Sequence, residues 1–278
     1  INKSIIRKNN PFQELSKNNE EVLKIFNSVD KFSEKSEIRY VGGCIRKILN
    51  NEKVDDIDLA TNLEPKQVCE ALKKKDIKHF ETGIEHGTVT AVIDEYKFEI
   101  TSLREDTFTD GRHAKVKFSK NWKEDSLRRD FTINSIYSDT EGNLFDPHNG
   151  KNDLEEGTIR FIGDADIRIK EDYLRILRYI RFFLNYSKQP HDLEIIKKLK
   201  INIGGVSKLS KERLIDELKK ILVLDTIEKL SKDKQCFDLI LVIFPELINI
   251  KIFSNLKSYQ KELMRKIDFI QILSLLII

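Results

Sequence analysis

Residues 38–60 read IRYVGGCIRKILNNEKVDDIDLA, and this stretch decides the fold of the first half of the chain. It predicts a short apolar strand at residues 38–41 that ends in Gly42-Gly43, followed by a short helix at residues 45–49. Two glycines let a phosphate approach the backbone, and the first turn of a helix offers free N–H donors beside the charge of Arg46. Taken alone, a glycine pair is more often only a tight turn, so the pattern has two interpretations.

A pair of carboxylates follows on a second predicted strand, residues 56–60. Asp56 and Asp58 are two positions apart, so on a strand they project from the same face. They repel each other unless a cation lies between them, and Mg²⁺ ions that bridge them to a triphosphate would relieve the repulsion. The alternative is a solvated acidic edge, but Ile57 and Leu59 indicate that the opposite face of the strand is buried.

Glu99 is a candidate third catalytic carboxylate. It lies in a predicted strand at residues 97–101, which follows another at Thr88–Ile93. Phe98 and Ile100 are expected to point to the core, which leaves Glu99 on the opposite face. The alternative interpretation is an ordinary surface glutamate.

The two halves of the chain differ in their periodicity. Strands and helices alternate in the first half, while from about residue 167 only helices are predicted, including one at residues 170–184. A polar stretch at residues 104–115 has no clear period and is expected to be a loop. We therefore predict an α/β head with a mixed sheet, followed by an all-α neck and body. The expected bounds are 1–146 for the head, 147–205 for the neck and 206–278 for the body.

A charged cluster reads Arg128-Arg129-Asp130-Phe131-Thr132-Ile133-Asn134. In a helix, Asp130 and Asn134 would be four positions apart and share one face, where they can hydrogen-bond ribose hydroxyls. Arg129 beside them suits phosphate binding. The alternative is a helix start with a charged first turn.

A second charged cluster begins at Glu171-Asp172-Tyr173-Leu174-Arg175 and continues to Arg178 and Arg181. In one continuous helix, Asp172 and Arg175 would lie about 60° apart and could address one ligand together. Apolar residues surround them along the helix, so these charges need partners. The partner is either an internal Asp–Arg salt bridge or a nucleobase or phosphate.

These motifs, in this order, resemble those of the class II tRNA nucleotidyltransferase and bacterial poly(A) polymerase family. The resemblance runs from about residue 39 to residue 222. It implies that Asp56 and Asp58 bind catalytic Mg²⁺ and that Gly43 and Arg46 contact the triphosphate. It also implies that Arg129 contacts the nucleotide and that Asp130 and Asn134 lie near the ribose. Asp172 and Arg175 would read the base, and Arg178 and Arg181 would complete the pocket.

The resemblance also implies substrates and a switch. The partners would be tRNA, CTP and ATP, and residues 104–118 resemble the flexible loop that CCA-adding members use to change from C to A. The sequence departs from the family at Lys47, where Asp is common, and a C-terminal tail that grips tRNA is expected to be missing. The chain begins with Ile1 rather than Met, so we expect a fragment.

The reaction expected from this resemblance is attack of an RNA 3′-hydroxyl on the α-phosphate of CTP or ATP. C and A each present an amine next to a ring nitrogen acceptor, so a carboxylate and a guanidinium can select both and reject U and G. Two alternatives on the same scaffold are a poly(A) polymerase and a CC-adding enzyme. A catalytically inactive RNA-binding module is a third, and the three carboxylates together speak against it.

Composition sets few limits on the partners. The chain has 278 residues with a formal net charge of only +3, because 49 Lys and Arg face 46 Asp and Glu. A basic face can still form if these charges segregate. Cys44, Cys69 and Cys236 show no metal-ligand spacing, so we expect buried thiols in a reducing cytoplasm. The apolar end at residues 269–278 is shorter than the ~20 residues that span a bilayer, so no membrane association is expected.

Overall fold

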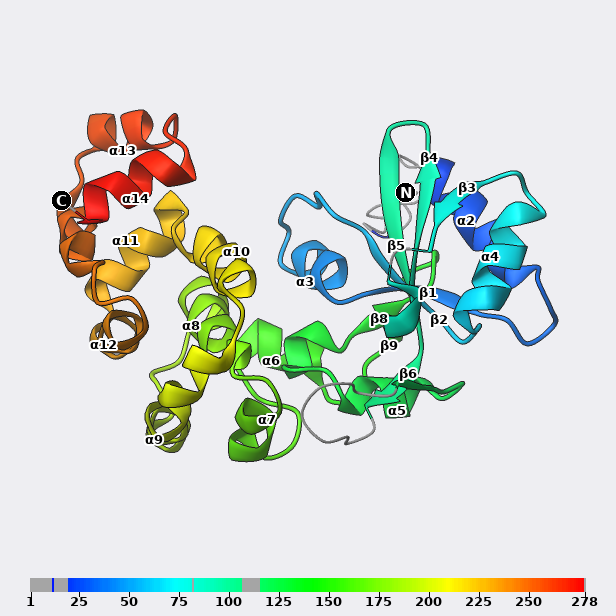
Figure 1. Cartoon of the computed structure of the whole chain (residues 1–278), viewed down its shortest axis with the longest axis horizontal. Helices are drawn as coiled ribbons and strands as arrows, with labels where there is room; N and C mark the ends of the chain where they lie inside the picture. Colours follow the sequence, from blue (N-terminus) through cyan, green and yellow to red (C-terminus); the bar gives the residue numbers. More distant parts are fainter. Residues whose placement is uncertain (1–11, 13–19, 82, 107–115, 278) are drawn as a thin grey trace, which may run out of the picture. The chain divides into compact units, whose positions relative to one another are not determined.

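A computed structural model describes residue 12 and residues 20–81, 83–106 and 116–277. The chain forms two compact units, Ile1–Glu155 and Glu156–Ile278, coloured from blue to green and from green to red in Figure 1. Each unit is described separately below. The predicted subdivision of the helical part into a neck and a body stays a prediction.

The first unit, the head, is built on a seven-stranded sheet. Its strand order is β3-β4-β5-β2-β1-β8-β9, and the pairing is mixed because β2 and β5 are parallel while the other neighbours are antiparallel. The predicted mixed sheet is therefore confirmed. The strands are β1 Ile38–Val41, β2 Asp58–Thr61, β3 Lys78–Phe80, β4 Thr88–Ile93, β5 Tyr96–Ser102, β8 Tyr137–Ser138 and β9 Leu144–Phe145.

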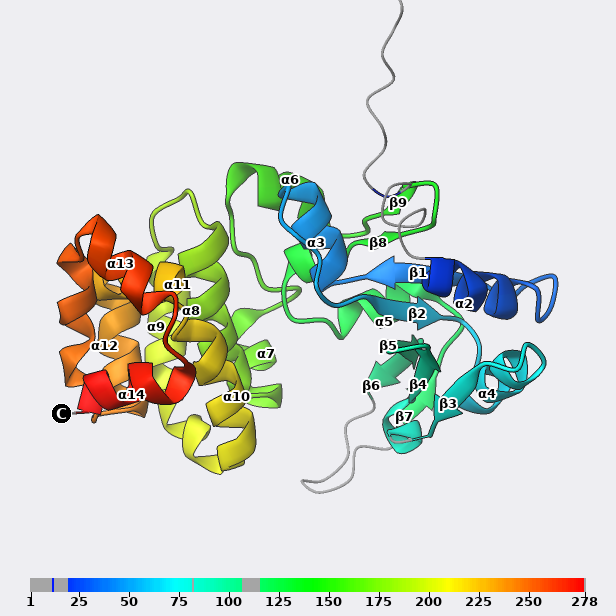
Figure 2. The same cartoon turned by 90° about the horizontal axis from the view of Figure 1, so that it is seen from above.

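Strand alternation gives the head sheet two apolar faces. On one face Tyr40, Leu59 and Ile100 pack with helices α2 Glu20–Asp30, α3 Gly43–Leu49 and α4 Pro65–Lys73. On the other face Ala60, Leu103 and Tyr137 pack with Trp122 of α5 Trp122–Leu127. Figure 2 shows β1 and β2 side by side, with α2 running along them. The head is completed by η1 Ile84–His86, η2 Thr132–Asn134 and α6 Gly150–Glu156.

The segment expected to be a loop at residues 104–115 is partly a β-ribbon. Strands β6 Arg104–Asp106 and β7 Val116–Phe118 pair antiparallel, with Arg104 opposite Phe118 and Asp106 opposite Val116. The prediction was wrong at residues 104–106, because a polar strand has no apolar period of its own, and its pairing partner lies beyond the segment. The centre, residues 107–115, lies outside the described residues.

From Ala165 onward, the regular elements among the described residues of the second unit are all helices, as predicted. Side-chain caps explain where several helices begin: Asp164, Asp192, Ser210 and Asp233 each accept a hydrogen bond from a backbone N–H of the first turn. The helices are α7 Ala165–Glu171, α8 Leu174–Tyr186, α9 Leu193–Asn202, η3 Ile203–Lys208, α10 Lys211–Ile221, α11 Leu224–Lys232, α12 Lys234–Ile243, η4 Ile248–Asn255, α13 Ser258–Met264 and α14 Phe269–Ile277.

One predicted helix, at residues 170–184, is in fact two. Helix α7 ends at Glu171 and α8 begins at Leu174, because Asp172 is extended with φ −152° and ψ 103°. The Asp172 carboxylate accepts a hydrogen bond from the Leu174 N–H at 3.2 Å and so starts the new helix. Aspartate side chains compete with helical backbone bonds in this way, which favours a break where apolar periodicity predicts continuity.

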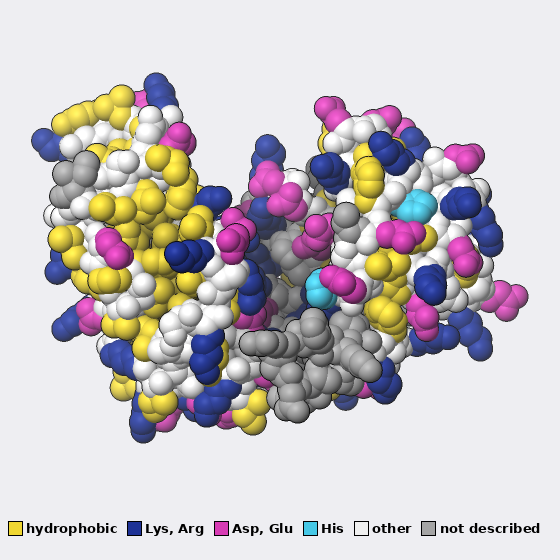
Figure 3. Space-filling view, in the orientation of Figure 1, with side chains coloured by type: hydrophobic (Ala, Val, Ile, Leu, Met, Phe, Trp, Pro, Cys, Tyr) yellow, Lys and Arg dark blue, Asp and Glu magenta, His cyan; other side chains and the backbone are white. Residues whose placement is uncertain are grey.

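The surface of the second unit carries many apolar side chains. Figure 3 shows them gathered on the face of this unit that it presents. Exposed large residues in its last third include Val242, Ile252, Leu263 and Ile270. No helix within the described ranges is both long enough and apolar enough to cross a bilayer.

Candidate active site

Two acidic side chains lie side by side on one face of the head sheet, and a third precedes them in the chain. Asp58 opens β2 and is in register with Glu99 on the parallel neighbour β5, while Asp56 lies two residues before Asp58. All three are exposed, whereas Phe98 and Ile100 are buried on the opposite face. The predicted orientation of Glu99 is therefore confirmed, and the sheet brings Asp58 and Glu99, which are distant in sequence, side by side.

The charge of this cluster is not balanced within the sheet. Protein atoms packed around the Asp58 carboxylate raise its pKa even though part of the side chain reaches solvent. Glu99 and Asp56 repel its negative charge and raise the pKa further, while the guanidiniums of Arg129 and Arg46 act in the opposite direction. Since the pKa is raised overall, repulsion and desolvation outweigh the two arginines, and a cation would stabilise the ionised cluster.

The glycine turn after β1 brings two arginines next to its backbone. Gly42 has φ 71° and ψ −119°, a conformation that side chains disfavour, and its N–H donates to the Ile136 carbonyl at 3.3 Å. A Cβ on Gly42 would lie 3.7 Å from Nη1 of Arg129, and a Cβ on Gly43 would lie 3.8 Å from Nη2 of Arg46. The two guanidiniums therefore lie directly beside the glycine turn.

The turn is also tied to the Asp130 region by a buried chain of hydrogen bonds. Arg46 donates to Oδ1 of Asn134, and Nδ2 of Asn134 donates to Oδ1 of Asp130 at 3.0 Å. All three side chains are buried. Asp130 does not lie in the helix that sequence analysis considered: Phe131 is extended and Thr132–Asn134 is a 3-10 turn. Asp130 and Asn134 still meet, because the turn reverses the chain within four residues.

Asp125 holds the arginine cluster in place, and sequence analysis missed it. The fully buried carboxylate accepts from Nε of Arg128 at 2.8 Å, from Nε and Nη2 of Arg129 at 3.2 Å, and from the Tyr137 hydroxyl at 2.7 Å. It also accepts from the backbone N–H of Arg104, at the base of the ribbon, at 3.3 Å. Its spacing three and four residues before the arginines was the available signal.

The electrostatics of Asp125 differ from those of Asp58. Burial alone would raise the pKa of Asp125, but the adjacent Arg129 and Arg128 outweigh it and leave the pKa below its usual range. Burial alone would lower the pKa of the Arg129 guanidinium, but its contacts with Tyr137 and Asp125 outweigh burial and raise the pKa. Asp125 is thus a compensated buried anion that fixes Arg129, whereas Asp58 belongs to an uncompensated cluster.

In the second unit, Asp172 and Arg175 have different ionic partners. Asp172 pairs with Arg213 of α10 at 2.8 Å, while Arg175 donates to Glu171 at 2.7 Å and to the Arg168 carbonyl at 2.7 Å. Arg175 is 9% exposed, but the side chains of Arg213 and Asp172 are 48% and 30% exposed. The internal Asp172–Arg175 salt bridge considered from the sequence is therefore replaced by two separate pairs.

The remaining two arginines of this motif flank one aromatic ring. The guanidiniums of Arg178 and Arg181 lie 5.3 Å and 4.2 Å from the ring centroid of Phe182. Nε of Arg181 also donates to the buried carboxylate of Glu217 in α10 at 2.5 Å. Sequence analysis assigned no role to Arg213 or Glu217, because only the fold brings α8 and α10 together. It also assigned none to Glu171, although its spacing four residues before Arg175 was an available signal.

Several known proteins are similar to this chain in sequence. Residues 38–160 match the family described as the poly A polymerase head domain. The human mitochondrial CCA tRNA nucleotidyltransferase 1 is 47% identical over 193 residues, which cover 68% of this chain and 44% of that protein. The CCA-adding enzyme of Lactobacillus johnsonii is 39% identical over 189 residues, which cover 66% of this chain and 46% of that enzyme.

The fold has a counterpart among solved structures. The CCA-adding enzyme of Bacillus stearothermophilus in complex with CTP superposes with a TM-score of 0.67 at 24% identity, over 92% of this chain and 68% of that chain. Taken together, the head-domain match, the sequence relatives and this common fold assign the chain to the class II tRNA nucleotidyltransferase and poly(A) polymerase family. The chain spans less than half the length of the two relatives described above.

Proposed function

We propose that this chain carries the catalytic part of a CCA tRNA nucleotidyltransferase. It would add C, C and A to the 3′ end of tRNA from CTP and ATP and release pyrophosphate. The observation that carries the proposal is the uncompensated group Asp56, Asp58 and Glu99, in a head whose glycine turn is faced by Arg46 and Arg129. The relatives named for CCA addition support this choice of reaction.

Divalent metal chemistry fits these residues. Carboxylate oxygens are the ligands that Mg²⁺ prefers. Burial raises the pKa of Asp58 most, and repulsion from Glu99 and Asp56 adds to it, so a bound cation would stabilise the ionised form. Asp56 and Asp58 would hold two Mg²⁺ ions, with Glu99 beside them. When bound, the ions would lower the pKa of the attacking hydroxyl and stabilise the leaving pyrophosphate.

The protein's own side chains would bind and orient the nucleotide. Arg129 turns Nη1 toward Gly42, and Arg46 turns Nη2 toward Gly43, so both can neutralise a triphosphate lying on the turn. Asp130 and Asn134 would hydrogen-bond the ribose. With the phosphates fixed in this way, the 3′-hydroxyl of the RNA attacks the α-phosphate and the bond to pyrophosphate breaks.

Base choice is assigned to the second unit. The Asp172 carboxylate would accept from the exocyclic amine of C or A, and Arg175 would donate to the neighbouring ring nitrogen, while Arg178 and Arg181 complete the pocket. Asp172 is partly exposed and its partner Arg213 is more so, which supports an exchange of that partner for a base. Arg175 is held by Glu171, which keeps its guanidinium in one orientation.

The switch from C to A is assigned to residues 104–118. Their described ends form the ribbon β6–β7, whose first residue, Arg104, donates its backbone N–H to Asp125. Asp125 also binds Arg129, which supports communication between the ribbon and the nucleotide-binding arginine. The centre of the segment, residues 107–115, lies outside the described residues.

The deciding experiment measures nucleotide addition. Purified protein is given labelled CTP or ATP, separately and together, with tRNA that lacks its CCA end. Product ends in CCA support the proposal, ends that stop at CC indicate a CC-adding enzyme, and extension with ATP alone on many RNA ends indicates a poly(A) polymerase. Absence of any incorporation by folded protein supplied with Mg²⁺ would contradict all three.

Cytoplasmic residence is also part of the proposal. The three cysteines are free thiols, as expected in a reducing compartment, although one relative is named as mitochondrial. Immunofluorescence of the native protein against cytoplasmic and organelle markers tests this assignment.

A further inference from the structure

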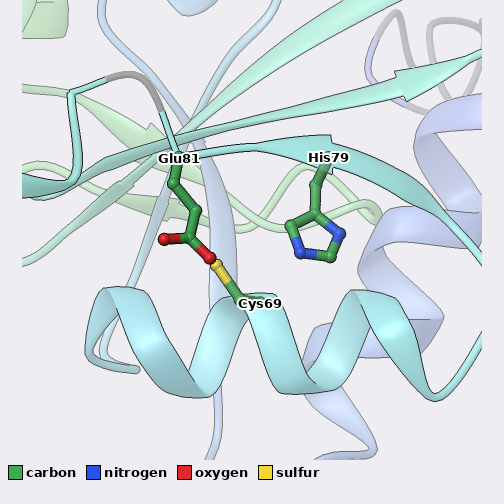
Figure 4. A group of neighbouring side chains, drawn as sticks. All are labelled: Cys69, His79 and Glu81. Atoms are coloured by element: carbon green, nitrogen blue, oxygen red, sulfur yellow. The ribbon is translucent and has the colours of Figure 1, made fainter.

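Three potential metal ligands converge at the outer edge of the head sheet. Cys69 lies in α4, His79 lies in β3, and Glu81 follows the end of that strand. One ligand atom from each side chain lies within 4.8 Å of the other two. Figure 4 shows the imidazole and the carboxylate directed toward the thiol from the strand above the helix.

The fold explains why these side chains meet. His79 and Glu81 are two positions apart, so they extend from the same side of the strand, and β3 is an edge strand of the sheet that packs beside α4. Cys69 follows Val68, a residue of the buried face of α4, and is itself only half-buried. The thiol expected to be buried therefore lies at the margin of the helix–sheet contact, where apolar partners give way to polar ones.

The three groups are oriented but do not bond to one another. Nδ1 of His79 lies 3.1 Å from the Ile77 carbonyl, a contact that fixes the ring and leaves its other nitrogen toward Cys69 and Glu81. None of the hydrogen bonds or ion pairs recorded for the described part of the chain joins Cys69, His79 and Glu81. A histidine held through one nitrogen by a backbone carbonyl, with the second directed at a thiol and a carboxylate, is typical of a metal ligand.

We propose that Cys69 Sγ, the second ring nitrogen of His79 and a Glu81 carboxylate oxygen bind one Zn²⁺ ion, with water as the fourth ligand. Sulfur and nitrogen ligands favour zinc over magnesium, so this site is distinct in chemistry from the Asp56–Asp58 cluster. Ligands of a tetrahedral zinc lie about 3.5 Å apart, so the three ligand atoms, now within 4.8 Å of one another, would be drawn closer by side-chain rotation. Binding displaces the Cys69 thiol proton to solvent.

The role of this ion would be structural. It would join α4 to the edge strand β3. Without the ion, these two elements are held together by packing. Bound zinc should raise the melting temperature of the head and leave Mg²⁺-dependent chemistry at the opposite face unchanged.

The test is a zinc titration of the full chain in excess Mg²⁺, which occupies the catalytic carboxylates. Competition with a chromophoric chelator should give one zinc per chain. Replacement by Co²⁺ should produce a thiolate-to-cobalt charge-transfer band. Cys69→Ser should lose the band, and Cys69→Ser and His79→Gln should each weaken zinc binding by about 10-fold or more, while circular dichroism of the metal-free proteins stays unchanged.

Two matched controls separate this site from other groups. The double variant Glu85→Gln/His86→Gln removes an exposed Glu–His pair of the same head that has no thiol, and should bind zinc normally. Asp233→Asn removes the carboxylate of the group His191, Asp233 and Cys236 in the second unit while keeping a helix-capping side chain, and should also bind normally. Unchanged binding in Cys69→Ser, loss in either control, or no zinc binding by the native chain would overturn the proposal.

Discussion

The two candidate parts of the nucleotide site differ in how their charges are balanced. In the head, burial raises the pKa of Asp58, and repulsion from Glu99 and Asp56 raises it further, despite two nearby arginines. In the second unit, the two residues proposed to read the base each have an ionic partner: Asp172 binds Arg213, and Arg175 binds Glu171. The first region would be stabilised by a bound cation, whereas the second would exchange an existing ionic partner for a ligand.

This difference separates two kinds of evidence for function. Unrelieved repulsion among carboxylates costs free energy and calls for a counter-ion, so it points to chemistry by itself. A satisfied ion pair is compatible with a purely structural role, and its function must be tested by what happens when the partner is removed. The expected effects of substitution are therefore largest in the head and smaller in the second unit.

The largest effect is expected for Asp58→Asn. Loss of this carboxylate removes a proposed metal ligand, and nucleotide addition should fall by about 10³-fold or more. The fold should be retained, because the variant relieves repulsion from Glu99 and Asp56. Incorporation of labelled CTP measures nucleotide addition, and circular dichroism shows whether the fold is retained. Substantial activity in the folded variant would exclude the two-metal assignment.

The stability of this variant should depend on pH in a defined direction. The pKa of Asp58 is higher in the folded protein than in the unfolded chain, so the native protein loses stability as pH rises from the ordinary Asp range through the raised value. Asn does not titrate. Asp58→Asn should therefore be more stable than the native protein at neutral pH, with the difference vanishing in acid; denaturant unfolding at both pH values measures it.

The next effect is expected for Asp125→Asn, which removes the compensating charge of the head. Its carboxylate binds Arg128, Arg129 and Tyr137 while fully buried, so its neutralisation should lower the free energy of unfolding by about 3 kcal/mol. Activity should fall as well, because Arg129 loses its orientation. Asp216→Asn, in an exposed pair with Lys219, is the control and should change stability little.

The pH dependence of this second variant has the opposite sign. The pKa of Asp125 is lowered in the folded protein, so its contribution to stability is complete above the ordinary Asp range and is lost as pH falls through the lowered value. The gap between native protein and Asp125→Asn should therefore narrow in strong acid. A gap that stays constant would show that the Asp125 charge contributes nothing and that only its hydrogen bonds matter.

Sequence alone predicted the mixed sheet and the orientation of Glu99, which follows from a period of two. It was wrong in placing Asp56 on the same strand as Asp58, because β2 begins only at Asp58. Phe98 and Ile100 mark the core side, and Glu99 must lie on the other. The match of Glu99 with Asp58 could not be predicted, since it depends on which strands are neighbours and in what register. Roles in catalysis were assigned by resemblance, and they remain proposals for this chain.

The second unit was harder to predict at the residue level. The pattern of residues 170–184 is helical, but the side chain of Asp172 ends one helix and starts the next. Arg213 lies 41 positions from Asp172, and no local pattern links the two. Long-range ion pairs of this kind are set by helix packing, which a single sequence does not reveal.

A smaller effect, on selectivity rather than on rate, is expected for Asp172→Ala. The substitution removes the proposed acceptor for the amine of C or A, and a hydrogen bond to a charged group contributes about 1.5–3 kcal/mol. The preference for CTP over UTP should therefore fall by about 10- to 100-fold. The ratio of the two incorporation rates is the measurement, and an unchanged ratio would leave Asp172 with the structural role of starting α8 and pairing with Arg213.

The smallest effect is expected for Arg213→Gln, which tests whether partner exchange occurs. This exposed ion pair contributes little to stability, so the fold should be unaffected. Because Arg213 competes with the base for the Asp172 carboxylate, its removal should lower the KM for CTP by about two- to five-fold and keep the preference for CTP over UTP. A loss of selectivity equal to that of Asp172→Ala would instead mean that Arg213 orients Asp172 for base reading. Conversely, an unchanged KM together with unchanged selectivity would mean that the pair is not broken when nucleotide binds, and base choice would then have to be assigned to other residues.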